Sequence, residues 1–262
     1  MGNIVLAISL STILAAFARF RRSVTTAAAV LAWAFAVCIT YFGGIPAFLA
    51  LAATLVFAVI SGKIYPSRRK NRSEIGLKHG QRDIVQIICN VSIGTLMLLC
   101  YGIFEKEIFL VCYGAAMAAS LADSMASEIG VLSSRPAVDI ISRKPVTAGL
   151  SGGITTLGIA ASAVGAIIIA SVFAPASGLS LWAFAVIALS GLCAALFDSM
   201  LGSTLQVKYR CPKCGSITER PLHCETQGEK YAGVSFMTND AVNLLNNIFS
   251  VVFAAVLILI GG

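Results

Sequence analysis

Residues 179–198 read LSLWAFAVIALSGLCAALFD, an apolar run that ends in a single carboxylate, Asp198. A helix needs about 20 mostly apolar residues to cross the roughly 30 Å hydrocarbon core of a bilayer. The stretch therefore predicts a transmembrane helix, and it places an acidic side chain at one end of that helix. Seven further stretches of the chain are of the same apolar kind.

The composition of the whole chain agrees with a membrane protein. Of its 262 residues, 58% are hydrophobic and only 12% are charged, and the mean hydropathy is +0.88. Soluble domains carry roughly 25% charged and about 45–50% apolar residues. These values exclude a soluble enzyme, a disordered chain and a secreted disulfide scaffold. They also leave no stretch long enough for a second, soluble domain.

Eight stretches qualify as membrane spans by length and apolar character. They are residues 3–18, 24–42, 46–64, 83–104, 108–127, 151–173, 179–198 and 240–260. The sequence therefore predicts an all-α fold, a polytopic transmembrane helical bundle of about eight spans that forms a single domain over residues 1–262. A polar loop with Cys and His residues, 207–233, is expected to be inserted between the last two spans.

The basic residues determine the expected orientation of this integral membrane protein. Every Lys and Arg except Lys106 follows the first, third, fifth or seventh span. Because Lys and Arg accumulate in cytoplasmic loops, we expect these four loops in the cytoplasm and both termini outside. The net charge of +7 is then mainly an orientation signal. No basic module interleaved with aromatic residues accompanies it, so we expect no nucleic-acid partner.

Acidic side chains gather at the predicted cytoplasmic ends of the spans. They are Asp83, Asp123, Glu128, Asp198 and Asp240. Ionisable residues in or beside a span are costly and usually functional. An Asp at a helix N-terminus is also explained by capping, whereas Asp123 and Asp198 lie at predicted C-termini, where the helix dipole disfavours an anion. We therefore expect a cation to compensate these two carboxylates.

A short internal repeat supports that expectation. Leu121–Met125 reads LADSM and Leu196–Met200 reads LFDSM, and small residues follow each copy. Two carboxylates on two such helices can hold a hard divalent cation such as Mg²⁺ through oxygen ligands and water. The small residues alone are equally explained by close helix packing.

The stretch Lys144–Gly153, KPVTAGLSGG, is a candidate phosphate-binding segment. Its glycines let backbone N–H groups approach an anion, and the start of the sixth predicted helix adds partial positive charge. Lys144 supplies a full charge, and Thr147 and Ser151 supply hydroxyl donors. A glycine-rich helix entry can equally be a turn and a packing surface. The P-loop pattern G-x-x-x-x-G-K-[ST] is absent, which excludes a P-loop protein.

The loop before the last span carries a pattern typical of a zinc site. Cys211-Pro-Lys-Cys214 is followed by the adjacent pair His223-Cys224, which together provide four ligands of the kind that Zn²⁺ prefers. Because all four positions would be filled by protein, the predicted site is closed and structural, a small zinc knuckle in a cytoplasmic loop. A redox or incidental cysteine cluster is the alternative.

At these residues the sequence resembles one integral membrane family, which contains the plant phytyl-phosphate kinase and transmembrane protein 19. The resemblance rests on four motifs in the same order, Ala122–Gly130, Lys144–Gly153, Asp198–Gln206 and Asn239–Asn243. Gly80–Asn90 is similar to a further family element but departs from it at Gln81 and Cys89, and Val91 stands where Gly is usual. The likeness covers most of the chain from about residue 60.

The resemblance implies a membrane kinase that converts a prenyl monophosphate, of the phytyl or geranylgeranyl type, into the diphosphate. Related membrane kinases use CTP, so CTP is the expected donor, ahead of another nucleoside triphosphate. The physics agrees, because a prenyl tail belongs in the bilayer while its phosphate lies at the surface, where the polar residues are. Phosphoryl transfer needs positioning and charge neutralisation more than covalent chemistry.

On this interpretation each candidate residue has a hypothetical role. Asp123 and Asp198, with Glu128 and Asp240, bind Mg²⁺. The donor phosphates are held by Lys144 and by the segment that follows it, together with a hydroxyl of the seventh span: Thr147, Gly149, Ser151, Gly152, Gly153 and Ser199. The acceptor phosphate is held by Arg82 and Lys78, and Asn90 and Asn243 orient groups within the cavity.

Two other functions compete with the kinase. A cytidylyltransferase acting on a lipid phosphate would share CTP and Mg²⁺ but release pyrophosphate. A secondary transporter would also use buried carboxylates and an internal repeat. Transporters usually place such groups near the midplane of the membrane, whereas here the carboxylates are expected at one face.

Overall fold

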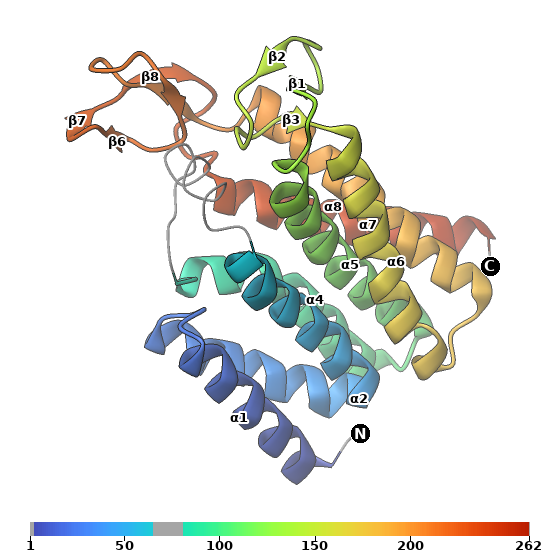
Figure 1. Ribbon diagram of the computed structural model, residues 1–262. Helices are drawn as coiled ribbons and strands as arrows, with labels where there is room; N and C mark the ends of the chain where they lie inside the picture. The colour runs from blue at the N-terminus through green and yellow to red at the C-terminus, as the bar shows by residue number, and fades with distance from the viewer. Residues whose placement is uncertain (1–2, 65–80, 262) are drawn as a thin grey trace.

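The computed structural model describes residues 3–64 and 81–261 (Figure 1). Its helices are α1 (Ile4–Phe20), α2 (Thr26–Ile64), α4 (Ile84–Phe104), α5 (Glu107–Gly130), α6 (Thr156–Phe173), η1 (Pro175–Ser177), α7 (Leu181–Thr204) and α8 (Asn239–Gly261). In this described part, six helices, α2 and α4 to α8, are long and apolar enough to cross a membrane. The 17-residue α1 is apolar but shorter. The predicted helical bundle is confirmed.

Helix α2 contains two of the predicted spans. The helical conformation breaks at Gly44, whose φ of 67° and ψ of −166° are not helical, and Pro46 follows directly. A positive φ is accessible to Gly because it has no Cβ. Figure 1 shows the two parts of α2 running in different directions on either side of this point. The predicted spans 24–42 and 46–64 correspond to these two parts.

Helix α5 lies at the centre of the bundle. It packs against α4, α6, α7 and α8, and most of its residues from Leu110 to Ala122 are buried. Small residues allow this packing, because a Cβ added at Gly191 of α7 would lie 2.7 Å from the Cβ of Ala118 on α5. Small residues that follow the two copies of the repeat also lie in close contacts. A Cβ added at Gly158 of α6 would lie 3.2 Å from Ala126 O of α5, and one added at Gly202 of α7 would lie 2.8 Å from Gly152 N.

Three small sheets lie at one end of the helices (Figure 1). The first has the order β2-β1-β3 and joins β1 (Ala137–Asp139) to β2 (Pro145–Val146) and β3 (Gly153–Ile154). The insert before α8 holds a sheet β5-β4-β8, made of β4 (Lys208–Arg210), β5 (Ile217–Thr218) and β8 (Glu229–Ala232), and the pair β6 (Leu222–His223) and β7 (Thr226–Gln227). All of these pairings are antiparallel.

Candidate functional site

A cavity of about 520 Å³ opens at this end of the bundle. It is lined by the C-terminal ends of α1, α2, α5 and α7 and by the N-terminal ends of α4, α6 and α8. The positions of the Lys and Arg residues in the sequence predict that these same helix ends lie on one side of the membrane. The predicted site residues that line the cavity are Arg82, Asn90, Asp123, Glu128, Gly149, Ser151, Gly152, Gly153, Asp198, Ser199, Asp240 and Asn243.

Asp123 and Asp198 face this cavity from deeper positions than the sequence predicts. Helix α5 continues to Gly130 and α7 to Thr204, so both carboxylates lie well inside their helices and not at the C-termini. The helix dipole acts mainly within the last turn, so it does not disfavour these two carboxylates as their expected C-terminal position would imply. Asp198 Oδ2 is buried and has no hydrogen-bond partner among the described residues. The negative charges of Asp123 and Glu219 act on this carboxylate.

Asp83 has the simpler role. It is the N-cap of α4, its Oδ1 accepts the backbone N–H of Gln86 at 3.0 Å, and it does not line the cavity. The convergent acidic set of the cavity therefore consists of Asp123, Glu128, Asp198 and Asp240, joined by Glu219. Among the described residues, the one group of three or more His, Cys, Asp or Glu side chains placed to hold a metal ion is the Cys/His cluster of the insert, so these carboxylates do not form such a group.

The glycine-rich segment lies in a loop instead of opening a helix. Helix α6 begins only at Thr156, and the expectation of a helix from residue 151 is wrong by one turn or more. Gly149 and Gly152 have φ values of 91° and 90°. A Cβ at Gly152 would lie 2.6 Å from the Cα of Ser203, so the loop is pressed against the end of α7. The Lys144–Gly153 and Asp198–Gln206 motifs thus dock directly on each other.

Two residues predicted to hold phosphate lie outside the cavity. Lys144 and Thr147 are exposed and do not line it. The turn between β1 and β2 explains this position, since Lys144 O accepts the N–H of Asp139 at 2.9 Å and its side chain projects from the edge of the small sheet. Lys78 falls outside the described residues.

Among the described residues, three arginines supply the positive charge of the cavity, and only one of them, Arg82, is proposed from the sequence. Arg21 and Arg22 follow α1, and Arg82 precedes α4. A parallel bridge joins Val24 to Arg82, with Arg82 N–H donating to Ser23 O at 2.8 Å and Thr25 N–H donating to Arg82 O at 3.0 Å. This backbone contact brings the segment after α1 next to the segment before α4, and no pattern in the sequence predicts it.

Glu219 is the other residue that sequence reasoning missed. It lies between β5 and β6 of the insert, yet it lines the cavity and is only 3% exposed. Its Oε1 accepts the backbone N–H of Ser151 at 2.9 Å, which ties the insert to the glycine loop. As a single carboxylate in a polar loop, it carries no sequence signal.

A buried lysine and a second carboxylate accompany Glu219. Lys208 is 7% exposed; burial lowers the pKa of its ammonium, and the charges of Glu219 and Asp139 oppose that shift. For Asp139, burial would raise the pKa, but hydrogen bonds from Ser142, Ser203 and the Ile141 N–H outweigh it and lower the pKa. Both carboxylates therefore favour the charged lysine beside them.

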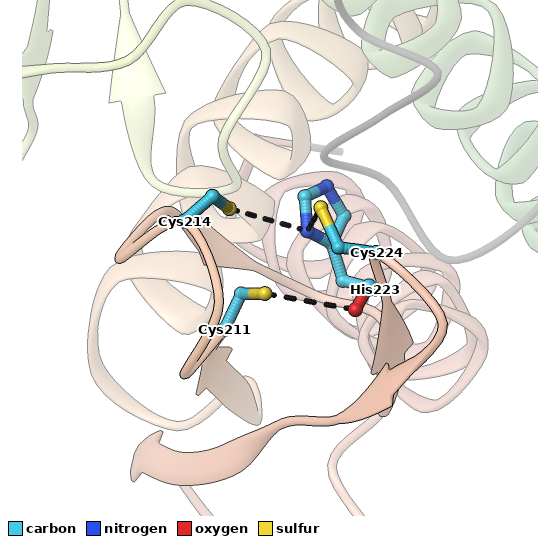
Figure 2. Close-up of side chains that lie close together, drawn as sticks. All are labelled: Cys211, Cys214, His223 and Cys224. Atoms are coloured by element: carbon cyan, nitrogen blue, oxygen red, sulfur yellow. Dashed lines mark hydrogen bonds between the residues drawn. The ribbon is translucent and has the colours of Figure 1, made fainter.

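The cysteines and histidine of the insert come together as a candidate metal site (Figure 2). The ligand atoms of Cys211, Cys214, His223 and Cys224 all lie within 4.8 Å of one another. His223 Nδ1 lies 3.5 Å from Cys214 Sγ and 3.3 Å from Cys224 Sγ. Sulfur ligands around tetrahedral Zn²⁺ are about 3.8 Å apart, given Zn–S bonds of about 2.3 Å. The donor set and its spacing fit zinc.

The backbone bends sharply to let adjacent residues point at one centre. Cys224 and Glu225 form the two-residue turn between β6 and β7, and their φ values are 52° and 61°. Positive φ at both central residues is the type I′ hairpin geometry, which usually needs Gly or Asn. This strained turn directs both His223 and Cys224 toward Cys214, so adjacent ligands are compatible with one site.

The thiols of the cluster differ in acidity. The hydrogen bond with His223 lowers the pKa of Cys211 to about 6, whereas burial and the neighbouring Cys214 and Cys211 thiols raise the pKa of Cys224 to about 11. Cys211 thus forms a thiolate readily, and its negative charge opposes the deprotonation of Cys224. A divalent cation removes that repulsion and allows all three sulfurs to bind as thiolates.

Comparison with known proteins agrees with a membrane protein of this architecture. Residues 9–251 match the model of the family described as integral membrane protein DUF92. The chain is similar to Protein PGR of Arabidopsis thaliana, with 29% identity over 243 residues that cover 78% of this chain and 83% of the relative. No solved structure matches the chain significantly.

Proposed function

The chain belongs to the DUF92 family of integral membrane proteins, and from this premise we propose that it is a membrane phosphotransferase. It transfers the γ-phosphoryl group of a nucleoside triphosphate, CTP, to a prenyl monophosphate and forms the prenyl diphosphate. The observation that carries this proposal is the cavity in which four helix-borne carboxylates, three arginines and a glycine loop face one another. A transmembrane bundle with such a polar end suits a substrate that has an apolar tail and an anionic head.

The carboxylates suit Mg²⁺. Mg²⁺ usually takes one or two protein carboxylates and fills its other positions with water and substrate phosphates. Carboxylates that line one cavity without forming a tight group are compatible with that arrangement. The buried Asp198 Oδ2, which lacks a hydrogen-bond partner among the described residues, is available to a cation. Asp198 and Asp123 would hold the metal, with Asp240 and Glu128 nearby. When bound, Mg²⁺ neutralises charge on the phosphates.

The positive side of the cavity suits two anionic substrates. Arg82, Arg21 and Arg22 can each donate several hydrogen bonds to phosphate oxygens. The Ser151 and Gly153 N–H groups already donate to Glu219 and to Leu150 O, so Gly149 and Gly152, with φ near 90°, would contribute by letting the donor phosphates approach the backbone of the loop closely. These groups replace Lys144 and Thr147 in the role that the sequence had assigned to them.

The transfer itself needs little beyond this positioning. An oxygen of the acceptor monophosphate forms a bond to the γ-phosphorus, and the bond between that phosphorus and the β–γ bridging oxygen breaks, releasing the nucleoside diphosphate. The acceptor oxygen is already deprotonated at neutral pH, so no general base is required. The arginines hold the two anions together against their mutual repulsion.

The orientation and the second metal complete the proposal. The positive-inside distribution of Lys and Arg supports a cytoplasmic position for the cavity and an outside position for both termini. We assign Zn²⁺ to the cluster of Cys211, Cys214, His223 and Cys224, whose four protein ligands make a closed, structural site.

The reaction class is tested with labelled nucleotide. Purified protein receives CTP labelled at either the γ- or the α-phosphate, Mg²⁺, and geranylgeranyl or phytyl monophosphate. We expect label from the γ position to reach the lipid, and omission of Mg²⁺ to abolish the transfer. Label from the α position would instead establish a cytidylyltransferase. If neither label moves and Asp198→Ala changes only ion flux in liposomes, the protein is a transporter.

A further inference from the structure

Glu219 is an unusual residue to find in the cavity, because it comes from the Cys/His insert and not from a helix. Its side chain is 3% exposed, and its Oε1 accepts the Ser151 N–H at 2.9 Å. Ser151 lies beside Gly152, whose backbone is pressed against Ser203 of α7. Glu219 therefore holds the segment of the glycine loop that is closest to the carboxylate-bearing helix.

The burial of this carboxylate is compensated by a built arrangement. Lys208 of β4, 7% exposed, places its positive charge near Glu219 and Asp139. Buried charges persist in proteins when they are paired and hydrogen-bonded. Glu219 and Asp198 of α7 line the same cavity, so the insert and α7 meet at its wall.

The position of Glu219 in the chain connects it to the metal cluster on both sides. Cys214 lies five residues before it, across β5, and His223 lies four residues after it, in β6. The strands β5 and β6 belong to two different sheets, and each has only two residues. Strands this short are not stable by themselves, so the conformation of the segment between them depends on the cluster residues at its two ends, Cys214 and His223.

We infer that the metal cluster positions Glu219, and through Glu219 the glycine loop, so that the cluster sets the geometry of the phosphate-binding cavity. Glu219 is then a positioning residue, because it acts on the loop through Ser151. Loss of the metal releases Cys214 from His223 and Cys224, which frees both ends of the Glu219 segment and removes the acceptor of the Ser151 N–H. The consequence for phosphates rests on the proposed function; the effect on the loop does not.

Hydrogen exchange at the peptide covering Gly149–Ile154 tests the inference without any assay of activity. Three variants are compared with the intact protein in nanodiscs: Glu219→Gln, Cys214→Ser, and Glu229→Gln as the matched control. Glu229 is an exposed glutamate of β8 in the same insert. Zinc content is measured for each by elemental analysis, and zinc is also removed from the intact protein with a chelator.

We expect Glu219→Gln to keep zinc and to raise exchange in this peptide about tenfold, because the neutral amide oxygen of Gln accepts a weaker hydrogen bond from Ser151 N–H than the carboxylate does. Cys214→Ser and chelation should lose zinc and raise exchange at least as much, while Glu229→Gln should change neither. Chelation of the intact protein covers the case in which Cys214→Ser does not fold. Zinc loss without faster exchange in the loop would overturn the inference, and so would unchanged exchange in Glu219→Gln.

Binding of Mg²⁺·CTP to the same samples separates this inference from the proposed function. If the intact protein binds no CTP but the exchange results hold, the proposed function fails and the positioning role stands. If it binds CTP and chelation leaves both the affinity and the loop exchange unchanged, the positioning role fails and the function stands.

Discussion

The two polar regions of this protein are built in opposite ways. The Cys/His cluster takes all of its ligands from residues 211–224. Two of them lie in the Cys211–Cys214 turn, and the other two lie at the hairpin turn between β6 and β7. The cavity takes its charged groups from segments as distant as Arg21 and Asp240, which meet only when the helices pack. The cluster is a compact set of soft ligands, and the cavity is a spread of hard oxygen ligands facing arginines. We therefore propose a structural role for the local cluster and the transfer reaction for the assembled cavity.

The largest expected effect separates the two regions by function. Asp198→Asn should lower the rate of γ-phosphoryl transfer about a thousandfold, because a group that holds charge in the reacting centre is lost. The zinc content should not change. The melting temperature should stay the same or rise slightly, because the substitution removes the repulsion between Asp198 and the negative charges of Asp123 and Glu219. Transfer rates, elemental analysis and thermal unfolding measure these outcomes.

Glu105→Gln is the control for that comparison. Glu105 is an exposed carboxylate that follows α4 and does not line the cavity. Its replacement should leave the transfer rate unchanged. Equal losses in both variants would mean that the cavity carboxylate has no special part in the reaction.

The second effect tests whether the cavity depends on close packing. Gly152→Ala should destabilise the protein by about 3 kcal/mol and reduce transfer strongly, because the new Cβ meets Ser203 at 2.6 Å and φ is 90°. Gly178→Ala has a φ of 70° but open space around the new Cβ, so it should cost only about 1 kcal/mol. Thermal unfolding gives both values, and equal losses would contradict the packing account.

The third effect concerns the cluster and its dependence on pH. The pKa of Cys211 is lowered to about 6 by its hydrogen bond with His223, so its thiolate is favoured at neutral pH and lost as the pH falls through that value. Metal competes with protons for the sulfur, so zinc should remain bound at pH 7 and be released on acidification, with a midpoint below about 6. Zinc retained after dialysis across this range is the measurement. Release above pH 7 would argue against the cluster.

The smallest expected effect tests the positive side of the cavity. Lys144→Ala should change the transfer rate less than about twofold, because exposed charges away from a site contribute little, whereas Arg82→Ala should lower it about a hundredfold. Lys144 is exposed outside the cavity and Arg82 lines it. A large loss in Lys144→Ala and a small one in Arg82→Ala would reverse the assignment.

The difference between the regions also explains what the sequence could predict. All four ligands of the cluster were found from their spacing, because they lie close together in the chain. In the cavity, Asp123, Asp198 and Asp240 were found because carboxylates stand out in apolar spans. Glu219 and Arg21 were missed because only tertiary packing brings polar loop residues to the site. Lys144 was placed there because the sequence does not reveal the β1–β2 turn that turns it outward.

The helix boundaries follow the same rule. Apolar length located the spans, including the two parts of α2 around Gly44. It did not locate the ends of α5 and α7, since both helices continue past the apolar stretch through polar residues, of which Glu128 in α5 and Ser199 in α7 line the cavity. A boundary set by a buried polar site is invisible to a hydropathy pattern.

The central claim, that the cavity is the site of phosphoryl transfer, is tested most directly by an experimental structure with Mg²⁺ and a CTP analogue that cannot transfer its γ-phosphate. The account predicts the triphosphate against the Gly149–Gly153 loop, with metal at Asp123 and Asp198. A triphosphate bound elsewhere on the protein, or bound in the cavity without metal at either carboxylate, would contradict it.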